Sequence, residues 1–345
     1  MIRLIKPETI VSLERSPFLK FSHQRLAFES LQCTHSVFPN ISNGLEKIGE
    51  EERETIAGRN AKSIETISGS LLSSREEFQR KLERSCENEN LEYVLLVSGN
   101  ERGNERSRGS FYRNQLLRTT EMLQIGREMK RDGRLSERVK FAVCANPNVE
   151  RTSAEYLENK VECGAELVIT QPFFHLERCN AWVSSALSKG LIDVNSGNDG
   201  SSRGSGAKLV IGVCAPATAS DVAFWGKLVY TASMQGAKDR SAKWISKTRS
   251  TPKSLWDIIQ TNTDEPIVKL MHEYEQRERE MHSETYRDWI FERCELNTVA
   301  ALANESSKGV HFMPISKIGY DICRRLSCRT REFEQIECGA FFCCC

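Results

Sequence analysis

Short apolar runs alternate with longer polar segments along most of the chain. Eight such runs recur, at Thr9–Leu13, His35–Phe38, Ile64–Ile67, Tyr93–Val97, Lys140–Ala145, Glu166–Thr170, Leu209–Cys214 and Gly309–Met313. Most are continuously apolar, which is typical of strands buried on both faces of a parallel sheet. The segments between them place apolar residues at helical spacing, as Phe78 and Leu82 do. The pattern predicts an α/β fold, a single-domain (β/α)8 TIM-type barrel, with an open doubly wound sheet as the alternative.

Two segments interrupt this rhythm. Residues 193–207 (DVNSGNDGSSRGSGA) are rich in Gly, Ser and Asn, which predicts a flexible surface insertion before the seventh strand. Residues 232–264 are polar and contain Trp244 and Trp256; they fit a loop-and-helix excursion, which we favour, or a substrate lid. We assign residues 9–326 to the barrel and residues 327–345 to a C-terminal tail that ends in three cysteines.

Length and charge narrow the class of protein. A chain of 345 residues is an ordinary length for one such barrel with insertions. Its 48 basic and 47 acidic side chains leave a net charge of +1, so no overall field attracts nucleic acid or an anionic membrane. No apolar run reaches the roughly 20 residues of a membrane helix, and the N-terminus lacks the apolar core of a signal peptide. We expect a cytoplasmic protein with small-molecule partners and no nucleic-acid or membrane partner; a homo-oligomer stays open.

The 13 cysteines raise the question of a metal site or disulfides, and their spacing argues against both. Most are scattered singly, and no C-x-x-C pair has the matching second pair that a structural zinc site needs. A chain of this size can bury its own core and does not depend on disulfides. We therefore expect reduced, mostly buried thiols and no metal.

In a barrel of this kind the active site lies at the carboxyl ends of the strands. The residues that close the apolar runs are small, polar or turn-forming: Glu14, 36–40, 98–100, 146–147, Gln171, 215–216 and 316–317. They contain no Ser-His-Asp arrangement, no His/Cys cluster and no P-loop. Amides, one carboxylate and one lysine suit the polar edge of a cofactor ring better than a nucleophile. We interpret His311 as a packed histidine, whereas His175 fits packing or a site equally well.

Three segments then carry a resemblance to a known family. FAVCANPN at 141–148, ENKVECGAELVITQPFF at 158–174 and GVHFMPISKIGYDICRRL at 309–326 resemble three signatures of the methylenetetrahydrofolate reductases, in that family's order. The second is the most specific, because it joins a helix end, a tight turn at Gly164–Ala165 and a strand that delivers Gln171 to the barrel mouth. Weaker matches include VSLERSP at 11–17, and together the matches span about residues 9–326.

The resemblance implies a flavin- and folate-binding oxidoreductase of one-carbon metabolism and methionine biosynthesis. Such an enzyme uses FAD to reduce 5,10-methylenetetrahydrofolate to 5-methyltetrahydrofolate, with NAD(P)H as hydride donor. By analogy, Glu14 would protonate the folate nitrogen as a general acid, and Gln171 and Lys317 would contact substrate. The cofactor contacts would come from Ser98, Gly99, Asn100, Asn146 and Lys160.

Three positions depart from the family pattern. Asn100 stands where the family has an aspartate beside the flavin, Thr66 aligns with a histidine, and Asn146 aligns with a tyrosine. Three lost hydrogen bonds would weaken FAD binding by roughly a thousandfold or more unless they are replaced. The alternative is therefore a catalytically impaired barrel that acts as a folate-binding or regulatory partner protein. The choice between NADH and NADPH stays open.

Overall fold

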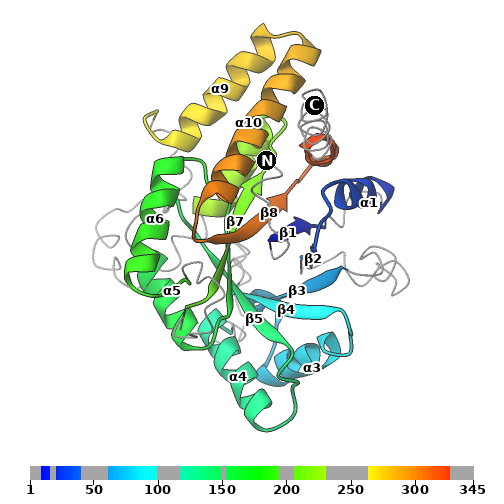
Figure 1. Ribbon diagram of the computed structural model, residues 1–345, viewed down its shortest axis with the longest axis vertical. Helices are drawn as coiled ribbons and strands as arrows, with labels where there is room; N and C mark the ends of the chain where they lie inside the picture. The colour runs from blue at the N-terminus through cyan, green and yellow to red at the C-terminus, as the bar shows by residue number, and fades with distance from the viewer. Residues whose placement is uncertain are drawn as a thin grey trace, which may run out of the picture.

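The computed structural model describes residues 9–15, 21–39, 61–98, 117–148, 153–193, 206–230 and 263–326. Eight parallel strands close into a barrel in chain order, with β8 paired to β1 (Figure 1). The strands are β1 (Ile10–Glu14), β2 (His35–Phe38), β3 (Lys62–Ser68), β4 (Leu91–Val97), β5 (Lys140–Ala145), β6 (Leu167–Thr170), β7 (Lys208–Cys214) and β8 (Ser307–Met313). The chain is a (β/α)8 TIM-type barrel, so the barrel prediction is confirmed over the open sheet.

Helices cover the outside of this barrel (Figure 1). They are α1 (Phe21–Ser30), α3 (Arg75–Ser85), α4 (Thr119–Arg131), α5 (Ser153–Glu162), α6 (Leu176–Ser188), α9 (Pro266–Glu280) and α10 (Ser283–Ala303), with a 3-10 turn η3 (Gly69–Leu71). Residues 219–230 and 317–326 are helical as well. Local sequence explains where α3 begins, because the Ser74 side chain accepts a hydrogen bond from the backbone N–H of Glu77 at 3.2 Å. No helix within the described ranges combines the length and apolar character needed to cross a bilayer.

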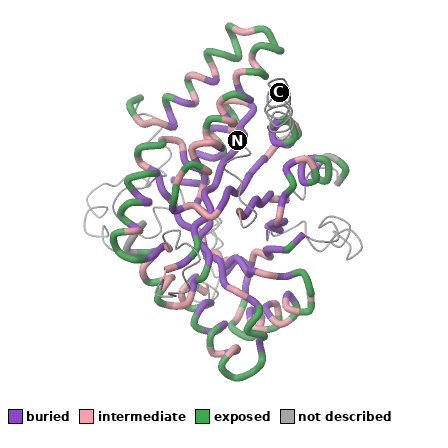
Figure 2. Tube along the Cα trace, in the orientation of Figure 1, coloured by how far each residue is buried: buried purple, intermediate pink, exposed green. Residues whose placement is uncertain are grey.

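The strands explain the continuous apolar runs. Each predicted run coincides with a strand to within two residues at either end. Alternate residues form two clusters, because successive side chains of a strand point to opposite faces. One fills the barrel: Ile10, Val37, Ile64, Tyr93, Leu95, Ala142, Leu167, Ile169 and Val210. The other packs under the helices, and Figure 2 shows the buried residues along the strands and the exposed ones on the outer helix faces.

Two glycines meet specific backbone demands. Gly164 ends the α5–β6 turn with φ of 102°, a conformation that favours glycine, which fits the tight turn predicted there. Gly309 pairs with Ile10, and a Cβ on it would lie 1.8 Å from the Ile10 carbonyl oxygen. Glycine therefore lets β8 approach β1 closely at this level of the barrel. Further along the same register, Ser12 pairs with His311.

The predicted insertion and tail are described only in part. Ile192 and Ala207 form an isolated bridge, so the two ends of the insertion at 193–207 meet at the start of β7. Residues 194–205, 232–262 and 327–345 lie outside the described residues. All eight described cysteines are free thiols, and five of them are buried: Cys33, Cys179, Cys214, Cys294 and Cys323. Burial of five of these eight thiols fits the mostly buried cysteines expected from the sequence.

Candidate functional site

Glu14 is the last residue of β1 and lies at the carboxyl end of the barrel. It follows Ile10 and Ser12 on alternate positions, and Ile10 belongs to the cluster inside the barrel. Its side chain is 32% exposed, and burial raises the pKa of Glu14 to about 7. A carboxyl with this pKa is substantially protonated at neutral pH. It therefore has the acidity of a general acid at the mouth.

His311 stands beside Glu14 on the neighbouring strand. It is 3% exposed, so the packed histidine expected from the sequence is observed. Its Nδ1 lies 3.0 Å from the Ser12 hydroxyl, and its Nε2 lies 3.9 Å from Oε2 of Glu14. Burial lowers the pKa of His311 to about 4, which makes it a neutral imidazole at physiological pH. The sequence did not reveal that this histidine faces the predicted acid.

Gln171 follows β6 and keeps one side-chain atom without a protein partner. Its backbone N–H donates to the Ala145 carbonyl at 2.7 Å, which holds the residue at the end of the sheet. Its side-chain Oε1 is buried and accepts no hydrogen bond. A buried polar atom left unsatisfied costs about 1–3 kcal/mol, and a ligand N–H would remove that cost. Gln171 therefore has the property expected of a ligand contact.

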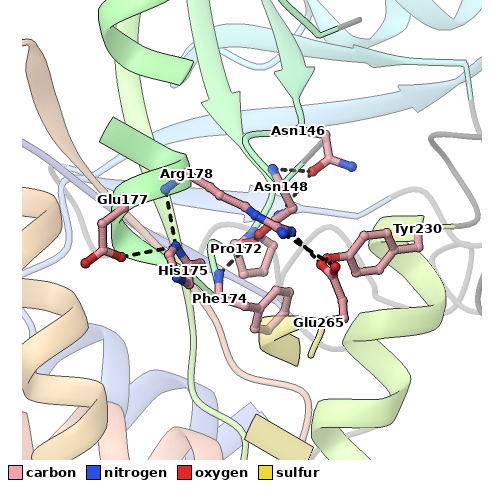
Figure 3. A network of polar contacts seen from close by, with 9 residues as sticks. All are labelled: Asn146, Asn148, Pro172, Phe174, His175, Glu177, Arg178, Tyr230 and Glu265. Atoms are coloured by element: carbon pink, nitrogen blue, oxygen red, sulfur yellow. Dashed lines mark hydrogen bonds and ion pairs between the residues drawn. The ribbon is translucent and has the colours of Figure 1, made fainter. Parts of the chain in front are cut away.

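Asn146 follows β5, and both ends of its side-chain amide form hydrogen bonds with protein groups. Its Nδ2 donates to the Val229 carbonyl at 2.9 Å, and its Oδ1 accepts from the backbone and side chain of Asn148. Asn148 in turn donates to the Pro172 carbonyl at 2.8 Å and accepts from the Phe174 N–H at 3.2 Å. Figure 3 shows how these contacts join the turn after β5 to the turn after β6. In this arrangement Asn146 stabilises the rim of the barrel.

The other described cofactor candidates are also engaged by protein groups. Lys160, in the last turn of α5, donates from Nζ to the Cys144 carbonyl at 2.7 Å, and burial lowers the pKa of Lys160. Ser98 accepts from the Thr119 N–H at 3.2 Å and bonds to the Thr119 hydroxyl at 2.9 Å, at the start of α4. Gly99 and Asn100 lie outside the described residues.

Two further positions from the sequence analysis lie around the same end of the barrel. Lys317 is exposed at the start of the helical residues 317–326, which follow β8. Thr66 lies within β3, paired with Leu95 of β4. The structure thus brings Glu14, Gln171 and Lys317 to the carboxyl ends of their strands. It leaves their predicted roles as predictions.

A polar network beside the mouth was not anticipated from the sequence (Figure 3). Arg178 of α6 reaches the Glu265 carboxylate with both terminal nitrogens, at 2.5 and 3.4 Å. The Tyr230 hydroxyl donates to the same carboxylate at 2.7 Å. His175 accepts from the backbone N–H of Arg178 and so caps α6, a structural use of this residue. One sequence signal pointed to Glu265. Proline favours the first position of a helix, so Pro266 indicates that α9 begins there and that Glu265 lies at its N-terminus.

Apolar side chains complete the surroundings of the polar groups. Val97 and Cys144 pack on the cluster inside the barrel. Trp225, from the helical residues 219–230, packs with Cys214 and Met313 at the ends of β7 and β8. Across the described ranges, no group of three or more His, Cys, Asp and Glu side chains is placed to hold a metal ion. The candidate site therefore combines an apolar surface with a proton donor, Glu14, and an unpaired amide oxygen, Oε1 of Gln171.

The fold and site define a (β/α)8 barrel with a candidate ligand site at its mouth. The sequence matches no protein-family model, and no curated protein matches it either. Among solved structures it is similar to an uncharacterized protein from Clostridium thermocellum that binds two copies of 5-methyl-5,6,7,8-tetrahydrofolic acid. The TM-score is 0.50 at 10% sequence identity, and the match covers 94% of this chain and 95% of that chain. A likeness at this identity supports the fold.

Proposed function

We propose that the barrel binds a reduced folate at the carboxyl ends of its strands. The observation that carries the proposal is the unpaired, buried Oε1 of Gln171 at the same end of the barrel as Glu14, whose raised pKa lets its carboxyl hold a proton near neutral pH. A pterin ring presents both N–H donors and nitrogen acceptors along its edges, so one flat ligand satisfies an acceptor and a donor. The tetrahydrofolate bound by the Clostridium thermocellum protein supports this choice of ligand.

Glu14 is proposed to act on that ligand as a general acid. Its O–H bond breaks as an N–H bond forms on the folate nitrogen, and the side chain is left as a carboxylate. A pKa of about 7 allows Glu14 to carry the proton at neutral pH and also to release it. FAD-dependent reduction of 5,10-methylenetetrahydrofolate to 5-methyltetrahydrofolate, with NAD(P)H as hydride donor, is the finer proposal for this site.

A second candidate follows from the contacts of three residues assigned to the flavin. The side chains of Ser98, Asn146 and Lys160 each make a hydrogen bond to a protein group, which gives them a structural use without a cofactor. The second candidate is a barrel that binds reduced folate without flavin chemistry and serves as a partner protein. It keeps the roles of Glu14 and Gln171 in binding and drops the redox step.

Calorimetric titration with 5-methyltetrahydrofolate tests the shared part of both candidates. The wild-type protein should bind, and Gln171→Leu should weaken binding by about tenfold, because an acceptor worth about 1–3 kcal/mol is removed. Gln276→Leu, an exposed position on α9, is the matched control and should bind as the wild type does. Absence of binding to the wild-type protein would overturn the proposal.

An absorption spectrum then separates the two candidates. The reductase predicts a yellow protein, or one that takes up added FAD and whose flavin bands bleach with NADH or NADPH. A colourless protein that binds folate and takes up no FAD supports the partner protein instead.

A further inference from the structure

Ser12, His311 and Glu14 form a row of polar side chains across the β1–β8 junction. Ser12 is fully buried and pairs in register with His311. The Ser12 hydroxyl lies 3.0 Å from Nδ1 of His311, and the opposite ring nitrogen lies 3.9 Å from Oε2 of Glu14. One imidazole therefore connects a buried hydroxyl to the proposed acid.

The contacts of Ser12 indicate which ring nitrogen carries the proton. A neutral imidazole has one N–H and one acceptor nitrogen. The Ser12 hydroxyl has two acceptors within reach, His311 Nδ1 at 3.0 Å and the Val310 carbonyl at 3.5 Å. The shorter contact favours donation of the Ser12 hydroxyl to Nδ1, which then accepts this hydrogen bond. The ring N–H is then on Nε2, the nitrogen that faces Glu14.

We propose that His311 is a positioning residue for Glu14, with its tautomer set by Ser12 and its Nε2–H directed at the Glu14 carboxylate. The proposal rests on the proposed function in one respect: the ligand nitrogen accepts the Glu14 proton. When that proton leaves, Oε2 gains negative charge and moves within hydrogen-bond distance of Nε2–H. The imidazole keeps its own proton throughout, so His311 orients and stabilises the anion without transferring a proton.

The groups on the opposite side of the barrel do not replace this donor. The Cys144 thiol of β5 is electrostatically coupled to Glu14, and burial raises the pKa of Cys144 to about 11, so it is neutral. Lys160, in the last turn of α5, donates to the backbone carbonyl of the same residue, Cys144, at 2.7 Å.

Arg15 and Tyr320, which lie close to Glu14 in the fold, make contacts with other groups. Arg15 points its Nη2 at the Ser36 hydroxyl at 3.1 Å and lies over the Phe28 ring. The Tyr320 hydroxyl donates to the backbone carbonyl of Glu14 at 2.6 Å, which fixes the strand end and not the carboxyl. His311, with Nε2 3.9 Å from Oε2, is a donor placed for the Glu14 carboxylate.

Carbon-13 NMR titration of the Glu14 carboxyl tests the proposal without any cofactor or substrate. The Glu14 signal is assigned by its loss in Glu14→Gln. His311→Phe should raise the pKa of Glu14 by about one unit, because an anion-stabilising donor is lost, and Ser12→Ala should raise it less. His272→Phe, an exposed position on α9, is the control histidine and should leave the Glu14 titration unchanged. Nitrogen-15 shifts of His311 should show protonated Nε2 and unprotonated Nδ1.

An unchanged Glu14 pKa in folded His311→Phe, or a His311 proton on Nδ1, would overturn the proposal. If His311→Phe does not fold, the tautomer of the wild-type protein and the Ser12→Ala titration decide the question. Neither measurement depends on folate or flavin. A protein that binds no folate would therefore refute the proposed function while this titration still tests His311.

Discussion

Two histidine–glutamate pairs lie at opposite ends of the barrel, and their carboxyl groups behave in opposite ways. At the amino ends of the strands, His35 lies 3.3 Å from Oε2 of Glu92, and Lys140 lies 3.3 Å from the other oxygen. The hydrogen bond from His35, with the nearby charge of Lys140, lowers the pKa of Glu92 to about 2. At the mouth, His311 lies 3.9 Å from Glu14, and burial raises the pKa of Glu14 to about 7.

The difference lies in the partners and not in the residue types. Glu92 has a hydrogen-bond donor and a cation on its two oxygens, so its ionised form is favoured. Glu14 has a neutral imidazole just beyond hydrogen-bond distance, so desolvation favours its protonated form. Polar groups at the amino ends of a barrel generally serve stability, and those at the carboxyl ends serve function. The proposed role of Glu14 fits that division.

The largest expected effect concerns the acid at the mouth. If the finer reductase proposal holds, Glu14→Gln should slow reduction of 5,10-methylenetetrahydrofolate by roughly 10²–10⁴-fold, the usual worth of general acid catalysis. Flavin reduction by NAD(P)H should be unchanged, because no proton from Glu14 enters that half-reaction. Stopped-flow absorbance measures both halves separately. Equal loss in the two would contradict the assigned role.

The same substitution should also remove the contribution of Glu14 to the pH dependence of stability. The folded-state pKa of Glu14 is raised above its ordinary value of 4.5, so its stabilising contribution is present below about pH 4.5 and lost as the pH rises through about 7. Glu14→Gln should therefore be more stable than the wild type at pH 8 by about 2 kcal/mol, after allowance for solvent screening, and similar to it at pH 4. Urea unfolding at both pH values measures this difference. Lower stability of the variant at pH 8 would rule out the raised pKa.

Glu92 should show the opposite sign and a smaller effect. Its folded-state pKa is depressed to about 2, so its contribution is present above about pH 4.5 and lost as the pH falls through about 2. Glu92→Gln should lower the free energy of unfolding by about 1 kcal/mol at pH 7, with the loss shrinking in acid. Urea unfolding at pH 7 and pH 3 tests this. A loss that is the same at both pH values would mean that packing, not charge, is responsible.

The smallest effect belongs to Lys140, the partly exposed cation beside the His35–Glu92 pair. Lys140→Met should cost about 0.5 kcal/mol, because its side chain is 37% exposed and water screens its attraction to Glu92. The cost should fall further at high salt. Thermal unfolding in low and high salt measures it. No comparable salt dependence is expected for Glu14→Gln at pH 4, where the carboxyl is neutral.

Local sequence was sufficient for the strands and for some of the turns. Continuous apolar runs such as 140–145 match β5, since burial on both faces requires hydrophobic side chains at every position. Gly164 was expected in a tight turn and adopts a positive φ. The placement of Gln171 at the end of β6 followed from the same pattern.

The uses of polar side chains were much less predictable. Asn146 and Lys160 were assigned to a cofactor, yet their polar groups reach Val229 and Cys144, which are 83 and 16 residues distant in the chain. Arg178 and Glu265 are 87 residues apart and form a bidentate pair. Contacts of this kind depend on which strand ends and loops become neighbours when the barrel closes. No periodic pattern encodes them.

The sequence by itself determined the eight-stranded barrel, because alternation of buried strands and amphipathic helices is a local and repeated signal. It also placed Glu14 at the end of β1. Only the tertiary structure decided that the pKa of this carboxyl is raised to about 7 and that His311, 297 positions later, faces it, whereas the pKa of Glu92 is lowered. The physical reason is that a pKa depends on desolvation and on the charges within a few ångströms. Both are set by closure of β8 against β1.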